Sequence, residues 1–75
     1  MKLTETVVGD IVRITGLDLV NHMVRRRLID LGIMEGTLIS IKKPLPFWGP
    51  YTLVACGQRI AIRRSEAHKI RVEAA

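Results

Sequence analysis

Side chains that could bind a metal ion are few and scattered along this 75-residue sequence. The candidates are two histidines, one cysteine and three acids: His22, Cys56, His68, Asp18, Asp30 and Glu66. Iron and zinc sites need several such groups converging, which appears in sequence as short ligand spacings. The sequence contains no C-x-x-C, H-x-x-x-H or E-x-x-H pattern, so we expect no dedicated metal site. Cys56, beside a turn, is better explained as a small buried hydrophobe.

Nucleophilic catalysis is equally unsupported by the residue pattern. Ser40 and Ser65 have no recognisable histidine and carboxylate partners, and Ser65 is explained as a helix cap. The six glycines are spread singly, so none forms the G-x-x-x-x-G-K-[ST] loop that cradles a nucleotide phosphate. We therefore expect a protein that is not an enzyme, carries no cofactor and is not itself a GTPase.

The stretch KKPLPFWGPYTL, residues 42–53, holds all three prolines and all three aromatic residues of the chain. Proline lacks an N–H donor and restricts the residue before it, so the segment predicts a stiff loop and not a central strand. A stiff loop loses little conformational freedom on binding. Phe47 and Trp48 are neighbours, so in extended backbone one of them is expected at the surface as a partner contact. The alternative is that both rings cover the core as a lid.

Positive charge dominates the chain, with 12 lysines and arginines, 7 acids and a net charge of +5. Such a field favours an anionic partner. The arginines at 25–27 are expected to fan across the outer face of a helix, as a docking patch or as a solvated face. Arg59 and residues 42–43 and 63–64 are expected to form a second basic set on the strands. The predicted partner-binding residues are Phe47, Trp48, Lys42, Lys43, Arg25, Arg26, Arg63 and Arg64.

Five short segments rich in alternating or β-branched apolar residues predict strands. Their expected ranges are 11–15, 37–43, 51–56, 59–64 and 70–72. Gly57 and Gln58 are expected at the centre of a type II′ hairpin turn between the third and fourth strands. Before the last strand, the sequence SEAHK predicts a single helical turn, with Ser65 as its cap and Glu66 in its first turn.

One helix is predicted between the first two strands. Four apolar residues from Val20 to Leu31 recur at spacings of four, four and three, which places them on one helical face. Asn21 is the expected N-cap and Gly32 the left-handed residue after the helix, which spans about 22–31. Together these elements predict a mostly β fold, a small five-stranded barrel, because closure removes the open edges of so short a sheet.

The length predicts one domain, 1–75, with a single small core. One cysteine allows no internal disulfide, which favours a reducing, cytoplasmic location. The longest apolar run is four residues, 53–56. A membrane-spanning helix needs about 20, so we expect neither a spanning segment nor a signal peptide.

Several segments together resemble the FeoA family, small cytoplasmic accessory proteins of bacterial ferrous-iron uptake. The matching pieces are GDIVRITG, RRRLIDLGIMEGTLISI, PLPFWGPY and GQRIAIRRSEAHKIRV, which follow the family's order and cover nearly the whole chain. The resemblance implies an SH3-like barrel. It also implies docking onto the cytoplasmic, GTPase-containing part of the FeoB membrane iron transporter, which would bring the protein to the membrane only through its partner.

Two other functions are left open by the residues. A basic small barrel with an exposed aromatic could bind nucleic acid, but no aromatic lies on the central strands, so nucleic acid is not the expected partner. The same module resembles the C-terminal domain of iron-dependent repressors, which would imply a metal-dependent regulator. No DNA-binding helix pair precedes it here, so we prefer the stand-alone module. An exposed apolar loop and open strand edges would permit weak self-association.

Overall fold

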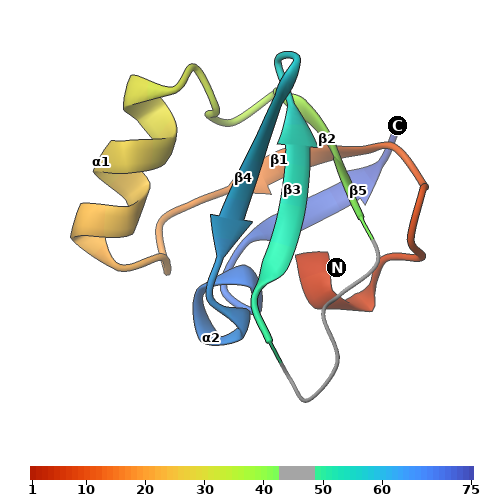
Figure 1. Cartoon of the computed structure of the whole chain (residues 1–75), viewed down its shortest axis with the longest axis horizontal. Helices are drawn as coiled ribbons and strands as arrows, with labels where there is room; N and C mark the ends of the chain where they lie inside the picture. Colours follow the sequence, from red (N-terminus) through yellow and green to blue (C-terminus); the bar gives the residue numbers. More distant parts are fainter. Residues whose placement is uncertain (43–48) are drawn as a thin grey trace.

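The computed structural model describes residues 1–42 and 49–75 and consists mainly of β-strands. The elements in chain order are η1 (Leu3–Glu5), β1 (Val12–Gly16), α1 (His22–Asp30), β2 (Leu38–Ile41), β3 (Tyr51–Ala55), β4 (Gln58–Ile62), α2 (Arg64–Ala67) and β5 (Arg71–Ala74). The predicted helix between the first two strands and the predicted helical turn before the last strand are both confirmed (Figure 1).

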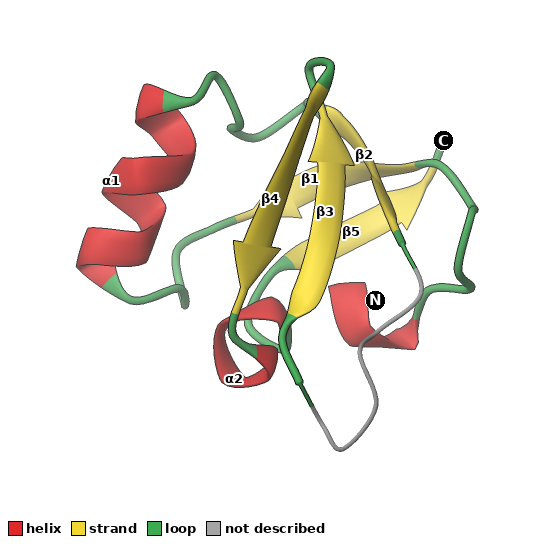
Figure 2. Cartoon of the chain, in the orientation of Figure 1, coloured by secondary structure: helices red, strands yellow, loops and turns green. Residues whose placement is uncertain are grey.

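The five strands form one antiparallel sheet in the order β4-β3-β2-β1-β5. Neighbours in sequence pair with each other, except that β5 returns to lie beside β1. The β3–β4 hairpin crosses over the β1–β5 pair, so the sheet curls back over itself (Figure 2). This curvature encloses the core between the two halves of the sheet.

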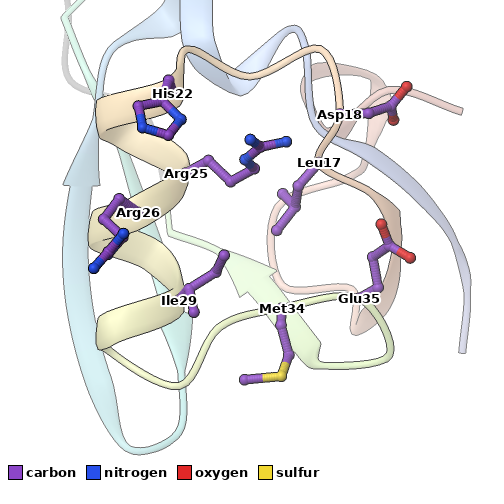
Figure 3. A pocket seen from close by; sticks show the side chains of 8 residues that line it. All are labelled: Leu17, Asp18, His22, Arg25, Arg26, Ile29, Met34 and Glu35. Carbon is purple, nitrogen blue, oxygen red and sulfur yellow. The ribbon is translucent and has the colours of Figure 1, made fainter.

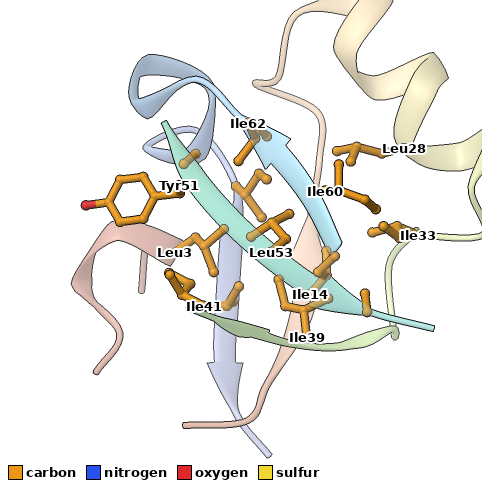
Figure 4. Packing of buried hydrophobic residues seen from close by; sticks show 14 of the residues in the cluster. Leu3, Ile14, Leu28, Ile33, Ile39, Ile41, Tyr51, Leu53, Ile60 and Ile62 are labelled. Carbon is orange, nitrogen blue, oxygen red and sulfur yellow. The ribbon is translucent and has the colours of Figure 1, made fainter. Parts of the chain in front are cut away.

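The core is built from the inward-facing positions of every strand. Buried and less buried residues alternate along β1 and β3, as expected for strands with one face on a core. Leu28 of α1 lies beside Ile60 and Ile33 (Figure 4). Val24 and Leu31 pack partly buried against the same cluster. The apolar stripe predicted for the helix is therefore the face that holds α1 against the sheet.

Both ends of α1 follow the predicted capping chemistry. Asn21 is the N-cap, and its side-chain oxygen accepts a hydrogen bond of 2.9 Å from the Met23 N–H. Gly32 has a φ of +84°, the left-handed conformation that commonly follows a helix. The helix ends at Asp30, one residue earlier than predicted, with Leu31 as its C-cap.

The β3–β4 hairpin turns one residue earlier than predicted. Ala55 pairs with Gln58, so the central residues are Cys56 and Gly57, with φ of 53° and 73°. Positive φ at both positions is typical of a type I′ turn, whose twist matches that of the flanking strands. Glycine suits either central position of such a turn. The prediction of Gly57 and Gln58 was therefore wrong. Cys56 is exposed on this turn, so the expectation of a buried cysteine was also wrong.

The start of α2 also differs from the prediction. Its N-cap is Arg63 and its first residue is Arg64, so Ser65 lies inside the helix and does not cap it. Glu66 is in the first turn as predicted. The side chain is buried, however, because it faces the start of α1 and not solvent.

The N-terminal residues complete the core and one sheet edge, which the sequence analysis did not predict. Leu3, in the single turn of η1, is fully buried. Its N–H donates to the Ile70 carbonyl at 2.8 Å, and the Val72 N–H donates to the Met1 carbonyl at 2.7 Å. The first residues therefore occupy the outer edge of β5.

Candidate partner-binding site

Those predicted partner-binding residues that the structure describes lie on three separate parts of the fold. Lys43, Phe47 and Trp48 lie outside the described residues, so the alternatives for the aromatic loop stay predictions. Lys42 follows β2 and is exposed, while its N–H donates to the Thr52 carbonyl at 2.9 Å. The end of β2 lies well apart from α1, which carries the other predicted arginines (Figure 1).

Arg63 and Arg64 are neighbours with different surroundings. Arg63 is exposed, as expected from its position after the inward-facing Ile62. Arg64 is half-buried against Tyr51: its Nη1 donates to the tyrosine hydroxyl at 2.8 Å, and its guanidinium carbon is 4.7 Å from the ring centroid. Tyr51 itself is buried in the core. Arg63 is therefore the more accessible of the two cations.

Arg25 and Arg26 line a groove beside α1, with a volume of about 470 Å³ (Figure 3). Three segments form it: the turn after β1, the outer face of α1 and the turn before β2. The lining residues are Leu17, Asp18, His22, Arg25, Arg26, Ile29, Met34 and Glu35. The groove thus combines cationic, anionic and aliphatic groups within one concave surface.

The sequence analysis identified only the two arginines of this groove. His22, Arg25, Arg26 and Ile29 recur at spacings of three, one and three, so they share one helical face. This face lies roughly opposite the face that packs on the core. The helical spacing alone therefore predicts that these four residues lie together. The contributions of Leu17 and Met34 were not visible, because they depend on how two turns fold against the helix.

Ion pairs use some of the charges around the groove. Asp18 pairs with Arg71 of β5 through a short Oδ1–Nη2 contact. A Cβ on Gly16 would lie 2.6 Å from the same Nη2, so the glycine leaves room for the Arg71 side chain. Arg26 and Asp30 form a longer, exposed pair at 3.8 Å. The Arg25 backbone N–H donates to the Asn21 carbonyl at 2.8 Å, but its side chain has no hydrogen bond or ion pair among residues 1–42 and 49–75.

The Asp18 carboxylate should make a small pH-dependent contribution to stability. A backbone hydrogen bond, and then the hydrogen bond with Arg71, lower the pKa of Asp18. A lowered folded-state pKa gives stability that is present above the unfolded value of about 3.9 and is lost as pH falls through the folded value. Because the group is exposed, we expect Asp18→Asn to lower Tm by only about 1–3 °C near neutral pH.

Thermal unfolding followed by circular dichroism between about pH 7 and pH 2.5 would measure this effect. The difference between wild type and Asp18→Asn should shrink toward the acid end, as the Asp18 carboxylate takes up a proton. A difference that grows as the pH falls would contradict this assignment.

The candidate metal ligands do not converge on one point, although Asp18 and His22 both line the groove. His22 lies in the groove, while the exposed Cys56 has its Sγ 3.8 Å from the Gly32 carbonyl oxygen. His68 has its Nε2 3.1 Å from the Lys2 amine and its Nδ1 3.2 Å from the Thr4 hydroxyl. Throughout the described ranges, no group of three or more His, Cys, Asp or Glu side chains is placed to hold a metal ion. Nor does this part of the chain contain a helix long and apolar enough to cross a membrane.

Comparison with known proteins identifies the family. The FeoA domain matches residues 1–74. This chain belongs to the FeoA family. The solution structure of the FeoA protein from Chlorobium tepidum is 34% identical, with a TM-score of 0.91, covering 99% of this chain and 70% of that chain. The FeoA family is associated with ferrous iron transport, so the coarse functional expectation is confirmed. Among curated proteins, none matches this sequence.

Two further structures define the fold. FeoA from Stenotrophomonas maltophilia, described as a prokaryotic SH3 domain protein and complexed with zinc, has a TM-score of 0.79 at 24% identity, covering 97% of this chain and 89% of that one. The manganese-activated repressor ScaR has a TM-score of 0.81 at 24% identity, covering all of this chain but 35% of that one. The predicted SH3-like fold is therefore confirmed, and the likeness to the repressor concerns the fold alone.

Proposed function

We propose that this FeoA-family chain acts as a single domain, residues 1–75, in ferrous iron uptake. It is a cytoplasmic accessory protein that docks onto the cytoplasmic, GTPase-containing part of a FeoB-type transporter. The match of the FeoA domain over residues 1–74 carries the proposal. The surface supports it, because exposed cations and a concave apolar groove are features of a protein that binds another protein.

Binding, and not turnover, is the proposed mechanism. Docking would favour an active state of the transporter part, and a bound protein shifts such an equilibrium only by as much as its affinities for the two states differ. The cationic residues predicted from the sequence would favour an acidic face on the transporter. Phe47 and Trp48 would add apolar contact from the proline-rich loop.

The docking claim is tested by measuring binding to the purified cytoplasmic part of a FeoB-type transporter. We expect wild type to bind and the Phe47→Ala/Trp48→Ala double variant to bind at least about 10-fold more weakly, because large aromatic contacts dominate many interfaces. Ile11→Ala, at a residue 60% exposed beside β1, is the matched control and should bind like wild type. Absence of saturable binding by the wild type would disprove the proposal.

Nucleic-acid binding has less support. Tyr51 is the one aromatic residue within the described strands, and it is buried and covered by Arg64. It therefore offers no exposed ring on which a base could stack. A titration with salt separates the two functions, because nucleic-acid affinity falls steeply as the salt concentration rises.

A further inference from the structure

We propose that the groove beside α1 binds a short segment of the protein partner that carries an aliphatic side chain followed by a carboxylate. This inference rests on the proposed function, since it assigns a surface and a recognition chemistry to the docking. It concerns other residues than Phe47 and Trp48, so the two sets can be varied independently.

The groove has an apolar floor that a single aliphatic side chain could cover. Leu17 lies at its base and is 3% exposed, whereas Ile29 and Met34 are 44% and 47% exposed. The three side chains come from different segments: Leu17 and Ile29 point into the space between α1 and the turn after β1, whereas Met34 lies at one end and its side chain extends away from Leu17 (Figure 3). Methionine adapts to varied partners, and an apolar floor with polar walls is typical of a site for one anchoring side chain.

One cation beside this floor is available to a ligand. Asp18 is neutralised by Arg71, and Arg26 has Asp30 as a distant partner. Arg25 is half-buried, points from α1 toward Leu17 and makes no ion pair within the described part of the chain (Figure 3). A guanidinium partly removed from water binds a carboxylate in a two-pronged geometry. The Arg25 charge acts on the nearby Asp18 carboxylate without pairing with it, because Asp18 pairs with Arg71. The Arg25 guanidinium is therefore open to a carboxylate of a ligand.

The remaining acid, Glu35, favours one orientation of a bound segment in the groove. Glu35, on the turn before β2, lines the groove and has no ion pair among the described residues. A carboxylate placed beside it would be repelled, whereas one placed at Arg25 would be attracted. Like-charge repulsion of this kind contributes to selectivity as much as attraction does. The bound segment should therefore place its acid toward α1 and carry no acid on the Glu35 side.

The first experiment uses the whole chain and synthetic probes, and so does not depend on the transporter. Two ten-residue Gly/Ser peptides are titrated into ¹⁵N-labelled protein, one with a central Leu-Asp-Glu and the other with Leu-Lys-Lys. We expect the acidic peptide to shift the amide signals of 17–18, 25–29 and 34–35 saturably, and the basic peptide to bind at least about 10-fold more weakly. Equal binding of the two peptides, or no saturable shift in the groove, would overturn the inference.

Variants then test the two parts of the groove. Arg25→Glu should weaken the acidic peptide about 10-fold or more, and Met34→Ser should weaken both peptides by removing part of the floor. Arg13→Glu is the matched charge control, since Arg13 is exposed on β1 and does not line the groove. Circular dichroism checks that each variant is folded, and Arg25→Ala replaces Arg25→Glu if the latter is not. Unchanged affinity in the groove variants would overturn the assignment.

The same variants in the transporter-binding assay separate the two proposals. If the groove is the contact, Arg25→Glu loses transporter binding whereas Arg13→Glu keeps it. If both bind like wild type, the inference is wrong and the proposed function stands. If wild type does not bind the transporter part, the proposed function is wrong, and the peptide titration still decides whether the groove binds an acidic aliphatic segment.

Discussion

Replacing Leu53 with alanine is expected to lower the free energy of unfolding by about 3 kcal/mol, within the range for buried leucine-to-alanine changes. Leu53 is fully buried in β3, the strand between β2 and β4. The surrounding strands can collapse only partly into the space left behind, so lost burial and an unfilled cavity both contribute. A domain of this size is stable by only about 4–11 kcal/mol, so the loss is a large fraction of the total.

Urea unfolding followed by far-ultraviolet circular dichroism measures this loss, with Leu38→Ala as the matched control. Leu38 lies on the neighbouring strand β2 but is 48% exposed, so its truncation should cost less than about 1 kcal/mol. Equal losses in the two variants would show that β3 does not occupy the centre of the core.

The Glu66→Ala variant is expected to lose about 1.5–3 kcal/mol, the usual contribution of a hydrogen bond to a charged group. Glu66 is 8% exposed, and its Oε2 accepts from the Asn21 N–H at 2.8 Å. Asn21 is the N-cap of α1, so this bond ties α2 to the start of α1. Removing the carboxylate leaves that N–H without its acceptor and loosens the docking of α1 on the sheet.

Two further variants separate this hydrogen bond from the ion pair beside it. Glu66→Gln keeps an acceptor oxygen, so it should lose about half as much stability as Glu66→Ala. Lys69, whose Nζ is 3.4 Å from Oε1, has a side chain that is 45% exposed. Lys69→Ala should therefore cost less than about 0.5 kcal/mol. If Lys69→Ala lowers the free energy of unfolding as much as Glu66→Ala does, the stabilisation comes from the ion pair and not from the Asn21 contact.

Predictions from local sequence succeeded where the deciding interactions lie within one turn of the chain. Asn21 caps α1 through the Met23 N–H, two residues away. Gly32 takes the left-handed conformation readily because it has no Cβ, whereas a residue with a side chain would be strained there. The apolar spacing from Val20 to Leu31 identified the buried helix face, and alternation identified the strands.

The predictions that were wrong depended on pairing between segments. Gly57 is compatible with two hairpin turns, and the pairing of Ala55 with Gln58 selects the one that exposes Cys56. Ser65 is a good capping residue by type, but α2 begins one residue before it. At the hairpin, the residue preference was satisfied by more than one register, and the pairing of β3 with β4 decided between them.

By itself, the sequence determined the mostly β class, the presence of the nine-residue helix with its N-cap and core face, and the excess of positive charge, because these follow from short-range periodicity and residue type. The family followed from the resemblance of several segments taken in order along the chain. Only the tertiary structure decided that Leu3 and Glu66 are buried. The backbone of Leu3 bonds to Ile70, and the side chain of Glu66 bonds to Asn21, both far away along the chain. The groove was likewise decided by folding, since two turns and one helix face must meet before Arg25 has an apolar floor beside it. Such long-range contacts leave no periodic signal in the residues that make them.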